Sequence, residues 1–439
     1  MVIHQKVPDI LNCRMEELQH YFLESWELND QLFSALQSES SFYLAPDPLR
    51  NPLIFYFGHT AAFYVNKLLL SGLIESGINS DYEIIFARGV DPATSDELDV
   101  LSQWPTVGEV EAYRKEVKSM VSRLINSMSS SISITEESPF WALLMAIEHD
   151  RIHFETSSVL IRQLDADLLK KPAQWRYAPS FGLPQENEWL TIQAKSVRLG
   201  RNKDATMFGW DNEFGEHIET TGDFQVSKNL ITNFEYLPFV EEGYNQRMYW
   251  SVEGWEWKTE ASALYPKFWV PVGKTFLYRA MFDVLEMPMD WPVEVNAFEA
   301  EAFCNWKDKE VRLLSEAEFN AVANMSARPD PTLEEWPNLN MKFGSPTPVG
   351  YCEDPHSEIN DLYGNVWDWL RDDFKPLPGF QPHRYYLDFS EPYFDNDHAM
   401  LLGGSWATTG TGASKYYRLW FRRFFFQHAG FRLSKALGE

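Results

Sequence analysis

The chain has 439 residues, too many for one ordinary hydrophobic core, so two domains are expected. Asp and Glu number 64 against 38 Lys and Arg, and the formal charge of −26 repels phosphate backbones and anionic membrane surfaces. Neither nucleic acid nor a membrane is therefore an expected partner.

Cysteine usage and the N-terminus point to the compartment. Cys13, Cys304 and Cys352 are too scattered for a disulfide framework or a thiolate metal site, and they fit a reducing environment. Residues 1–6 contain no apolar signal core, and charged residues break the apolar runs well short of the roughly 18 residues that a membrane helix needs. We expect a cytoplasmic protein.

Helical periodicity dominates the first part of the chain. Four amphipathic helices are predicted at residues 14–38, 53–77, 107–128 and 138–164. Four helices of this length predict a bundle, to which we assign residues 1–170. Residues 171–190 contain several prolines and are the expected linker.

The remaining residues, 191–439, have a different texture. Short apolar pieces are mixed with many Trp, Gly and Asn residues, and only two helices are predicted, at residues 296–307 and 315–325. This pattern predicts a loop-rich α+β domain stabilised by buried aromatic side chains. The single Gly-x-Gly, residues 410–412, lacks a third glycine and is expected to form a loop.

The most informative motif lies in the last helix of the predicted bundle. His149 and His153 are four residues apart, so their imidazoles project from one helix face and can bind one cation. His59 lies in another apolar helical run that could pack against the first. Three imidazoles from two helices would place a metal site in the core of the bundle.

Other interpretations of these residues are weaker. A single histidine on an apolar helix face is more often a core residue than a ligand. The histidine pair resembles a zincin motif, but Asp150 replaces the general-base glutamate and is about one methylene shorter. Glu155 would complete a site of two histidines and one carboxylate, but helical spacing directs it to another face.

Several motifs resemble known families. The C-terminal part resembles the formylglycine-generating-enzyme fold, which is also called the sulfatase-modifying-factor fold and is similar to C-type lectins. The resemblance lies in residues 209–213 (GWDNE), 364–369 (GNVWDW), 403–406 (GGSW) and 430–432 (GFR). The N-terminal part resembles a DinB-like bundle. Fused in this order, the two parts resemble the non-haem iron sulfoxide synthases of thiol-histidine biosynthesis over nearly the whole chain. The resemblance implies an Fe(II) site at three histidines, which map onto His59, His149 and His153.

Two branches of that family differ in substrate. The ergothioneine branch joins a thiol, often γ-glutamylcysteine, to trimethylated histidine, and typically has Gln before the last histidine ligand and an Asn-Trp-Asp near the C-terminus. Here those places hold Ile152 and residues 418–421 (RLWF). Residues 55–68, 153–164 and 421–432 instead resemble the ovothiol branch, which joins free cysteine to free histidine to give 5-histidylcysteine sulfoxide. We therefore expect L-cysteine, L-histidine and O2 as substrates, with the ergothioneine-type reaction as the alternative.

The sequence departs from the ovothiol branch in two ways. Those enzymes commonly carry a C-terminal methyltransferase domain, and this sequence ends at Glu439. A separate methyltransferase and a sulfoxide lyase are therefore expected in the pathway. The second departure is Phe424, where many relatives have histidine.

The resemblance also implies further site residues. It places a catalytic tyrosine ahead of an Asp-Phe-Ser triplet, here residues 388–390, and this alignment selects Tyr386 over Tyr385. A proton or electron from this tyrosine would favour carbon-sulfur bond formation over oxidation of cysteine to its sulfinate. For the substrate carboxylates, Arg422 and Arg423 are the candidates within a motif, with structural salt bridges as an equal alternative.

Two other functions stay open. The C-terminal fold also occurs in noncatalytic ligand-binding proteins, so the chain could be a binding module with a vestigial bundle. The presence of all three histidines argues against that interpretation. A thiol dioxygenase that makes only sulfinate is the other alternative, and oxygen uptake with cysteine alone would distinguish it.

Overall fold

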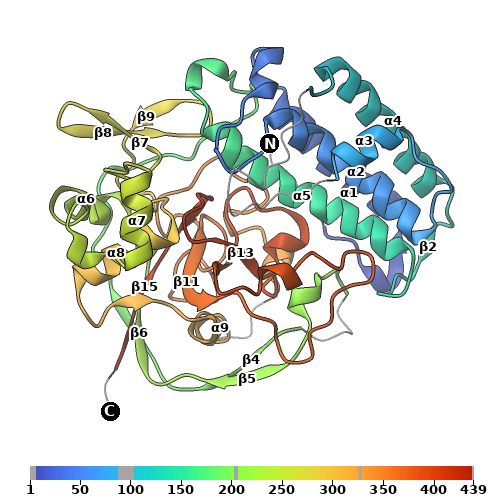
Figure 1. The fold of residues 1–439 in the computed structure, drawn as a ribbon. Helices are drawn as coiled ribbons and strands as arrows, with labels where there is room; N and C mark the ends of the chain where they lie inside the picture. Colours follow the sequence, from blue (N-terminus) through green and yellow to red (C-terminus); the bar gives the residue numbers. More distant parts are fainter. Residues whose placement is uncertain (1–5, 88–102, 202–205, 326–328, 438–439) are drawn as a thin grey trace.

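The computed structural model describes residues 6–87, 103–201, 206–325 and 329–437. A helical bundle formed by the N-terminal part packs along one side of a loop-rich domain of short helices and small sheets (Figure 1). This architecture confirms the predicted α+β class with an N-terminal bundle. Parts of the predicted bundle domain, residues 1–5 and 88–102, lie outside the described residues.

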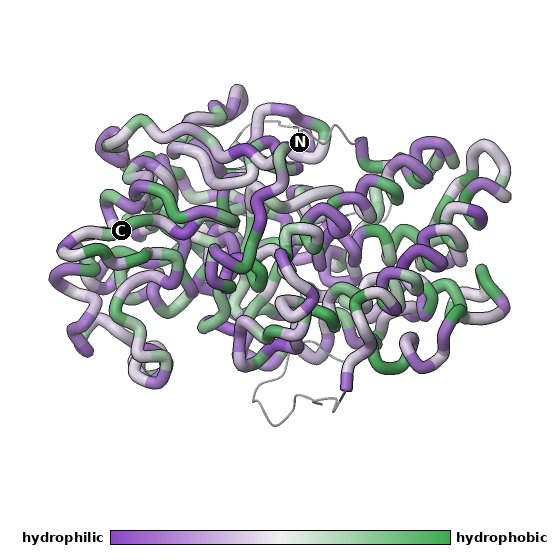
Figure 2. The backbone as a smooth tube through the Cα atoms, turned by 90° about the horizontal axis from the view of Figure 1, so that it is seen from above, coloured by the Kyte–Doolittle hydropathy of each residue, from purple (hydrophilic) through white to green (hydrophobic). Residues whose placement is uncertain are grey.

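The bundle contains the four predicted long helices and one short helix. Their bounds are α1 (Met15–Phe33), α2 (Leu53–Ser71), α3 (Ser80–Ile85), α4 (Val107–Asn126) and α5 (Phe140–Arg162), and a short antiparallel pair joins β1 (Cys13–Arg14) to β2 (Ser131–Ile132). Hydrophilic and hydrophobic segments alternate along the outer helices, as expected for amphipathic helices (Figure 2). Helix α2 ends earlier than predicted because Gly72 adopts a left-handed conformation, with φ of +77°, that terminates the helix.

Helix α2 is the apolar core helix of the bundle. By length and composition alone it could cross a membrane. Lys67, the one Lys, Arg, Asp or Glu in the helix, interrupts its apolar run. Most of α2 is buried inside the protein, as the core helix of a folded domain would be.

The second domain contains two four-stranded sheets. One has the order β10-β15-β6-β3 and is built from β3 (Trp189–Ile192), β6 (Phe224–Ser227), β10 (Arg312–Leu313) and β15 (Leu433–Ala436). The other has the order β13-β12-β11-β14 and is built from β11 (Trp367–Asp373), β12 (His398–Leu402), β13 (Leu419–Arg422) and β14 (Ala429–Gly430). Only the β11–β14 pairing is parallel within these two sheets of the described chain.

Smaller elements complete the domain. Antiparallel pairing joins β4 (Ser196–Leu199) to β5 (His217–Thr220), and β7 (Trp269–Val272) and β9 (Val284–Glu286) to β8 (Thr275–Arg279). The helices are α6 (Asn233–Glu242), α7 (Val252–Glu260), α8 (Ala297–Lys307) and α9 (Glu316–Ala323). The last two match the predicted helices, whereas α6 and α7 were not predicted. Both are short, and α6 contains Pro238, although the capping box between Thr232 and Glu235 marks its start.

The segment predicted as a linker packs against the second domain. Trp175 is buried, and its indole Nε1 donates a hydrogen bond to the carbonyl oxygen of Gly344 (2.9 Å). The backbone N–H of Ala178 donates to Ser345 Oγ (2.9 Å). This segment is therefore part of the contact between the two domains.

A buried ion pair joins the end of α5 to the second domain. The Arg162 guanidinium donates two hydrogen bonds to the Glu294 carboxylate, at 2.6 Å and 2.8 Å, and both side chains are almost fully buried. Burial alone would raise the pKa of Glu294, but the positive charge of Arg162 outweighs it and lowers the pKa to about 2. The Tyr278 hydroxyl donates to the same carboxylate.

We predict that breaking this pair destabilises the protein strongly. Arg162→Met leaves the buried Glu294 carboxylate without its guanidinium partner, which costs about 3–5 kcal/mol in the free energy of unfolding. The double variant Arg162→Met/Glu294→Leu removes both charges and should recover most of that loss. Urea unfolding of the two single variants and the double variant measures the three values. A double variant as unstable as the sum of the single variants would contradict the account.

Candidate metal centre

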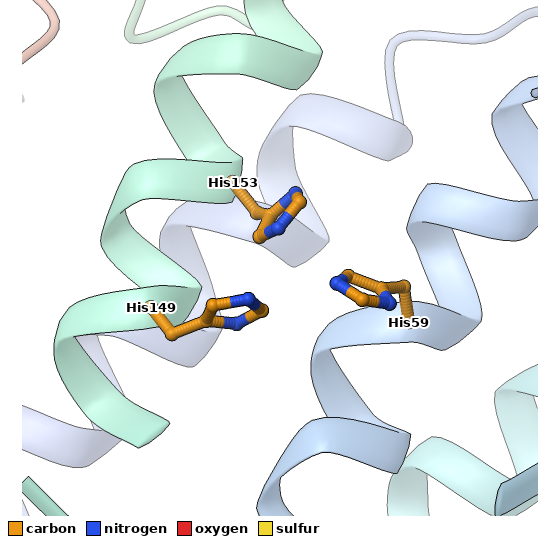
Figure 3. A group of neighbouring side chains, drawn as sticks. All are labelled: His59, His149 and His153. Atoms are coloured by element: carbon orange, nitrogen blue, oxygen red, sulfur yellow. The ribbon is translucent and has the colours of Figure 1, made fainter. Parts of the chain in front are cut away.

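Three histidines converge between α2 and α5. His149 and His153 project from one face of α5, and His59 faces them from α2 (Figure 3). Their ring centroids are 4.4 Å to 5.1 Å apart, and one nitrogen from each ring lies within 4.8 Å of the others. These distances suit three ligands of a single metal ion.

The tautomer of His59 is set by a backbone contact. His59 Nδ1 lies 2.5 Å from the carbonyl oxygen of Phe86, so a neutral ring must donate its proton there. Its lone pair is then at Nε2, which is buried and has no hydrogen-bond partner among the described residues. A ligating histidine commonly donates its other nitrogen in this way.

Two aromatic neighbours hold the rings of the triad. Phe63 stacks on His149 with 3.5 Å between ring centroids and 6° between planes, and Phe55 stacks on His59 at 5.0 Å. Gly58 lets the Phe86 ring pack against α2, because a Cβ at position 58 would lie 2.5 Å from that ring. The conformations of the rings are therefore fixed by packing.

The three imidazoles are neutral. Burial lowers the pKa of His59 to about 4, and it lowers the pKa values of His149 and His153 well below the usual value, with the neighbouring histidines acting in the same direction. Buried polar atoms without partners are rare. His59 Nε2 is such an atom. A cation bound by the triad fits this arrangement, and the structure brings together the three histidines that the sequence analysis selected.

The nearby carboxylates of α5 have other partners. Asp150 accepts hydrogen bonds from Ser25 Oγ (2.7 Å) and Asn29 Nδ2 (3.0 Å) inside the bundle. Glu155 accepts hydrogen bonds from Trp367 Nε1 (2.7 Å) and Thr408 Oγ1 (2.9 Å) in the second domain. Within the described residues, the metal-ligand group contains histidines alone. The geometry therefore gives no support to a zincin or a carboxylate-containing site.

A cavity of about 130 Å³ opens beside the triad, with walls from both domains. The bundle contributes His149, Ile152 and His153. Most of the second-domain wall is aromatic, and its rings include Tyr386, Phe389, Tyr393, Tyr417, Trp420, Phe421, Phe425 and Phe426. Charged groups on the described wall, apart from histidines, are Asp47 and Arg50, which no sequence motif marked. Substrate bound here would contact the triad and the second domain together.

The two candidate tyrosines differ in position. The Tyr386 ring lines the cavity, with its centroid 6.1 Å from that of His149 and 5.2 Å from that of Phe63. Burial raises the pKa of its phenol, so the hydroxyl keeps its proton at neutral pH. The neighbouring Tyr385 directs its hydroxyl elsewhere and accepts a hydrogen bond from Arg384 Nη2 (3.0 Å).

Arg422 and Arg423 form ion pairs outside the cavity wall. Arg422 Nη1 lies 2.6 Å from an oxygen of Asp397, and Arg423 contacts the carboxylates of Asp373 (2.5 Å) and Glu301 (3.3 Å). These contacts correspond to the salt-bridge alternative. A substrate role for either arginine stays a prediction.

Residues 410–413 have a role that the sequence analysis missed. They form a 3₁₀ turn against the bundle, where the backbone N–H of Thr411 donates to Glu148 Oε2 (2.9 Å). The other oxygen of Glu148 accepts a hydrogen bond from the Tyr21 hydroxyl (2.6 Å). This contact holds the second domain against α5 close to the triad. The Gly-x-Gly pattern predicts a loop, but nothing in it predicts a contact between this loop and the bundle.

Comparison with known proteins places both parts of the chain. The family model of the sulfatase-modifying factor enzyme 1-like domain matches residues 176–437, and that of the DinB superfamily matches residues 21–157. Hercynine oxygenase of Mycobacterium tuberculosis is 28% identical over 88% of this chain and 92% of its own length. Hercynine oxygenase of Mycolicibacterium smegmatis is 33% identical over 66% of this chain and 70% of its own length.

A fungal relative is longer. Ergothioneine biosynthesis protein 1 of Schizosaccharomyces pombe is 24% identical over 85% of this chain, which spans about half the length of that relative (50%). The matches join a DinB bundle to a sulfatase-modifying-factor domain in the order that the sequence analysis expected. The chain therefore belongs to the sulfatase-modifying factor enzyme 1-like family and, within it, to the sulfoxide synthases that include the hercynine oxygenases.

Proposed function

We propose that this protein is an Fe(II)- and O2-dependent sulfoxide synthase that joins the sulfur of a thiol to the imidazole carbon of a histidine derivative. The observation that carries this proposal is the triad of buried, neutral histidines beside a cavity that both domains line. The reaction balances as thiol plus imidazole C–H plus O2, giving sulfoxide plus water. Oxidation of the thiol alone to sulfinate also uses one O2, so the enzyme must select between two products.

The imidazole acceptor is best supported as trimethylated histidine. The named relatives are hercynine oxygenases and ergothioneine biosynthesis proteins, so they favour the ergothioneine-type reaction, which the sequence analysis put second. Aromatic rings attract quaternary ammonium groups, and the second-domain side of the cavity is mainly aromatic. Free histidine with free cysteine is the second candidate, because Ile152 and Phe421 line the cavity at places where the ergothioneine branch typically has polar residues.

The residues of the chain have distinct tasks in this proposal. Fe(II) held by the three neutral imidazoles would supply a Lewis acid for the thiolate and would pass electrons from the two substrates to dioxygen. His59, His149 and His153 hold their rings toward one point and add no negative charge. The aromatic wall excludes water and orients the acceptor imidazole beside the sulfur. Tyr386 keeps a phenolic proton at the cavity wall, next to the triad.

The metal assignment makes a direct prediction. Replacing His59, His149 or His153 with Ala should lower the iron bound per chain by about tenfold or more, because two imidazoles bind Fe(II) much less tightly than three. Iron content after anaerobic Fe(II) loading and desalting measures this. His217→Ala, at an exposed position in β5, is the matched control and should bind iron normally. Full occupancy in His149→Ala would contradict the assignment.

Substrate choice can be tested in one reaction. A mixture of cysteine, γ-glutamylcysteine, histidine and trimethylated histidine should give mainly a sulfoxide of the trimethylated imidazole, and mass spectrometry separates the four possible products. Aromatic contacts with the quaternary ammonium would make the preference about tenfold or more. A product dominated by histidine joined to cysteine would instead establish the ovothiol-type reaction.

Tyr386 is proposed to control the product. Tyr386→Phe removes one hydroxyl and keeps the ring, so the variant should bind iron and consume oxygen but make more sulfinate. Loss of about 1.4 kcal/mol of selective stabilisation changes the product ratio about tenfold. Tyr385→Phe is the control, because its hydroxyl contacts Arg384 and not the cavity. An unchanged ratio in Tyr386→Phe would show that this tyrosine has only a packing role.

A further inference from the structure

One face of α2 connects the triad with the second domain. His59, Phe63 and Lys67 are spaced four residues apart, so they lie on one face of the helix. His59 belongs to the triad, and Phe63 stacks on His149. Lys67, one turn further on, extends to the loop that carries Tyr386.

Lys67 contacts two consecutive residues of this loop. Its Nζ donates a hydrogen bond to the carbonyl oxygen of Tyr385 (2.6 Å) and lies 3.9 Å from the centroid of the Tyr386 ring. The negative charge of Asp388 in the same loop also favours the ammonium form. A backbone acceptor and an aromatic face thus bind one cation.

Residues 374–390 contain no regular helix or strand, and the backbone N–H of Tyr386 donates to the carbonyl oxygen of His383 (2.8 Å). His383 Nε2 lies 3.2 Å from the carbonyl oxygen of Glu136 in the bundle, and at the far end Ser390 Oγ donates to Asp211 Oδ1 (2.6 Å). The face of α2 that carries His59 meets this loop in two ways. Phe63 packs against the Tyr386 ring, and among the described contacts Lys67 supplies the hydrogen bond from this face to the loop.

The location of Lys67 strengthens these contacts. Burial lowers its pKa to about 8, and Asp388 partly offsets that effect, so the side chain is still mainly cationic at pH 7. Water screens a partly buried charge poorly, and a cation over a desolvated ring binds more strongly than one at an exposed site.

We propose that Lys67 is a positioning residue that holds Tyr386 beside the histidine triad and thereby directs the reaction toward the sulfoxide. This inference rests on the proposed function of the site. Lys67 reaches Tyr386 and the Tyr385 carbonyl, and it acts on the reaction through them.

The test compares product ratios in the iron-loaded full-length enzyme. Lys67→Met keeps most of the side-chain length but removes the charge and the donor. This variant should bind iron normally and raise the ratio of sulfinate to sulfoxide about five- to tenfold, in the same direction as Tyr386→Phe. Lys67→Arg restores a cation and a donor and should stay within about twofold of the native ratio. Adding Lys67→Met to Tyr386→Phe should change the ratio little further.

Lys258→Met is the matched control. Lys258 is a buried cation near aromatic rings, at 5.2 Å from Trp255 and 5.3 Å from Tyr244, and its Nζ donates to Asn245 Oδ1 (2.9 Å). None of its described contacts is with the loop that carries Tyr386. Its product ratio should equal the native ratio. A shift in Lys258→Met as large as that in Lys67→Met would overturn the inference, because general destabilisation would then explain both.

Amide hydrogen exchange in the metal-free protein provides a readout independent of activity. Residues 383–390 should exchange faster in Lys67→Met than in the native protein, and Lys67→Arg should restore most of the protection. Unchanged exchange together with an unchanged product ratio in Lys67→Met overturns the inference. If Tyr386→Phe itself leaves the ratio unchanged, the proposed role of Tyr386 fails, and exchange alone then decides whether Lys67 positions the loop.

Discussion

The burial of helix α5 on all sides is the constraint on which the rest of the structure depends. A helix with this many ionisable side chains can be buried only if each charge has a partner, because an unpaired buried charge costs several kcal/mol. Glu155 and Arg162 find their partners in the second domain, and Glu148 bonds to both domains. Asp150 has its partners inside the bundle, and burial lowers the pKa values of His149 and His153, so these two rings carry no charge that needs a partner. Docking of the domains and formation of the histidine triad are therefore two consequences of the same helix.

This arrangement explains why the chemistry needs two domains. The bundle alone supplies the three imidazoles, but the cavity walls beside them and the Tyr386 phenol belong largely to the second domain. Since sulfoxide and sulfinate formation use the same amount of oxygen, the protein can select between them only by placing the imidazole and a proton donor correctly. Precision in the domain contact is then a catalytic requirement. The buried hydrogen bonds of Glu155 and Glu148 lie within two turns of the triad and supply that precision.

The sequence predicted the long helices and the pair His149 and His153 from local signals, the helical period and the spacing of four residues, whereas His59 was assigned as the third ligand by the family resemblance. It also selected Tyr386 by a motif.

Contacts between distant segments have no such local signal, and the ion pair of Arg162 with Glu294 joins residues 132 positions apart. For the same reason Arg422 and Arg423 looked like carboxylate-binding residues, although the structure gives them Asp397, Asp373 and Glu301 as partners. Local motifs favoured the ovothiol branch, whereas the named relatives favour the ergothioneine-type reaction, which the sequence analysis put second.

The central claim is that three neutral imidazoles at the domain contact hold one Fe(II) to which the thiol substrate binds. X-ray absorption at the iron K-edge tests it most directly, on protein loaded with Fe(II) under anaerobic conditions. The account predicts the scattering signature of about three imidazoles, and a sulfur shell that appears when the thiol substrate is added. A spectrum with mainly oxygen ligands, or one that gains no sulfur with saturating thiol, would contradict it.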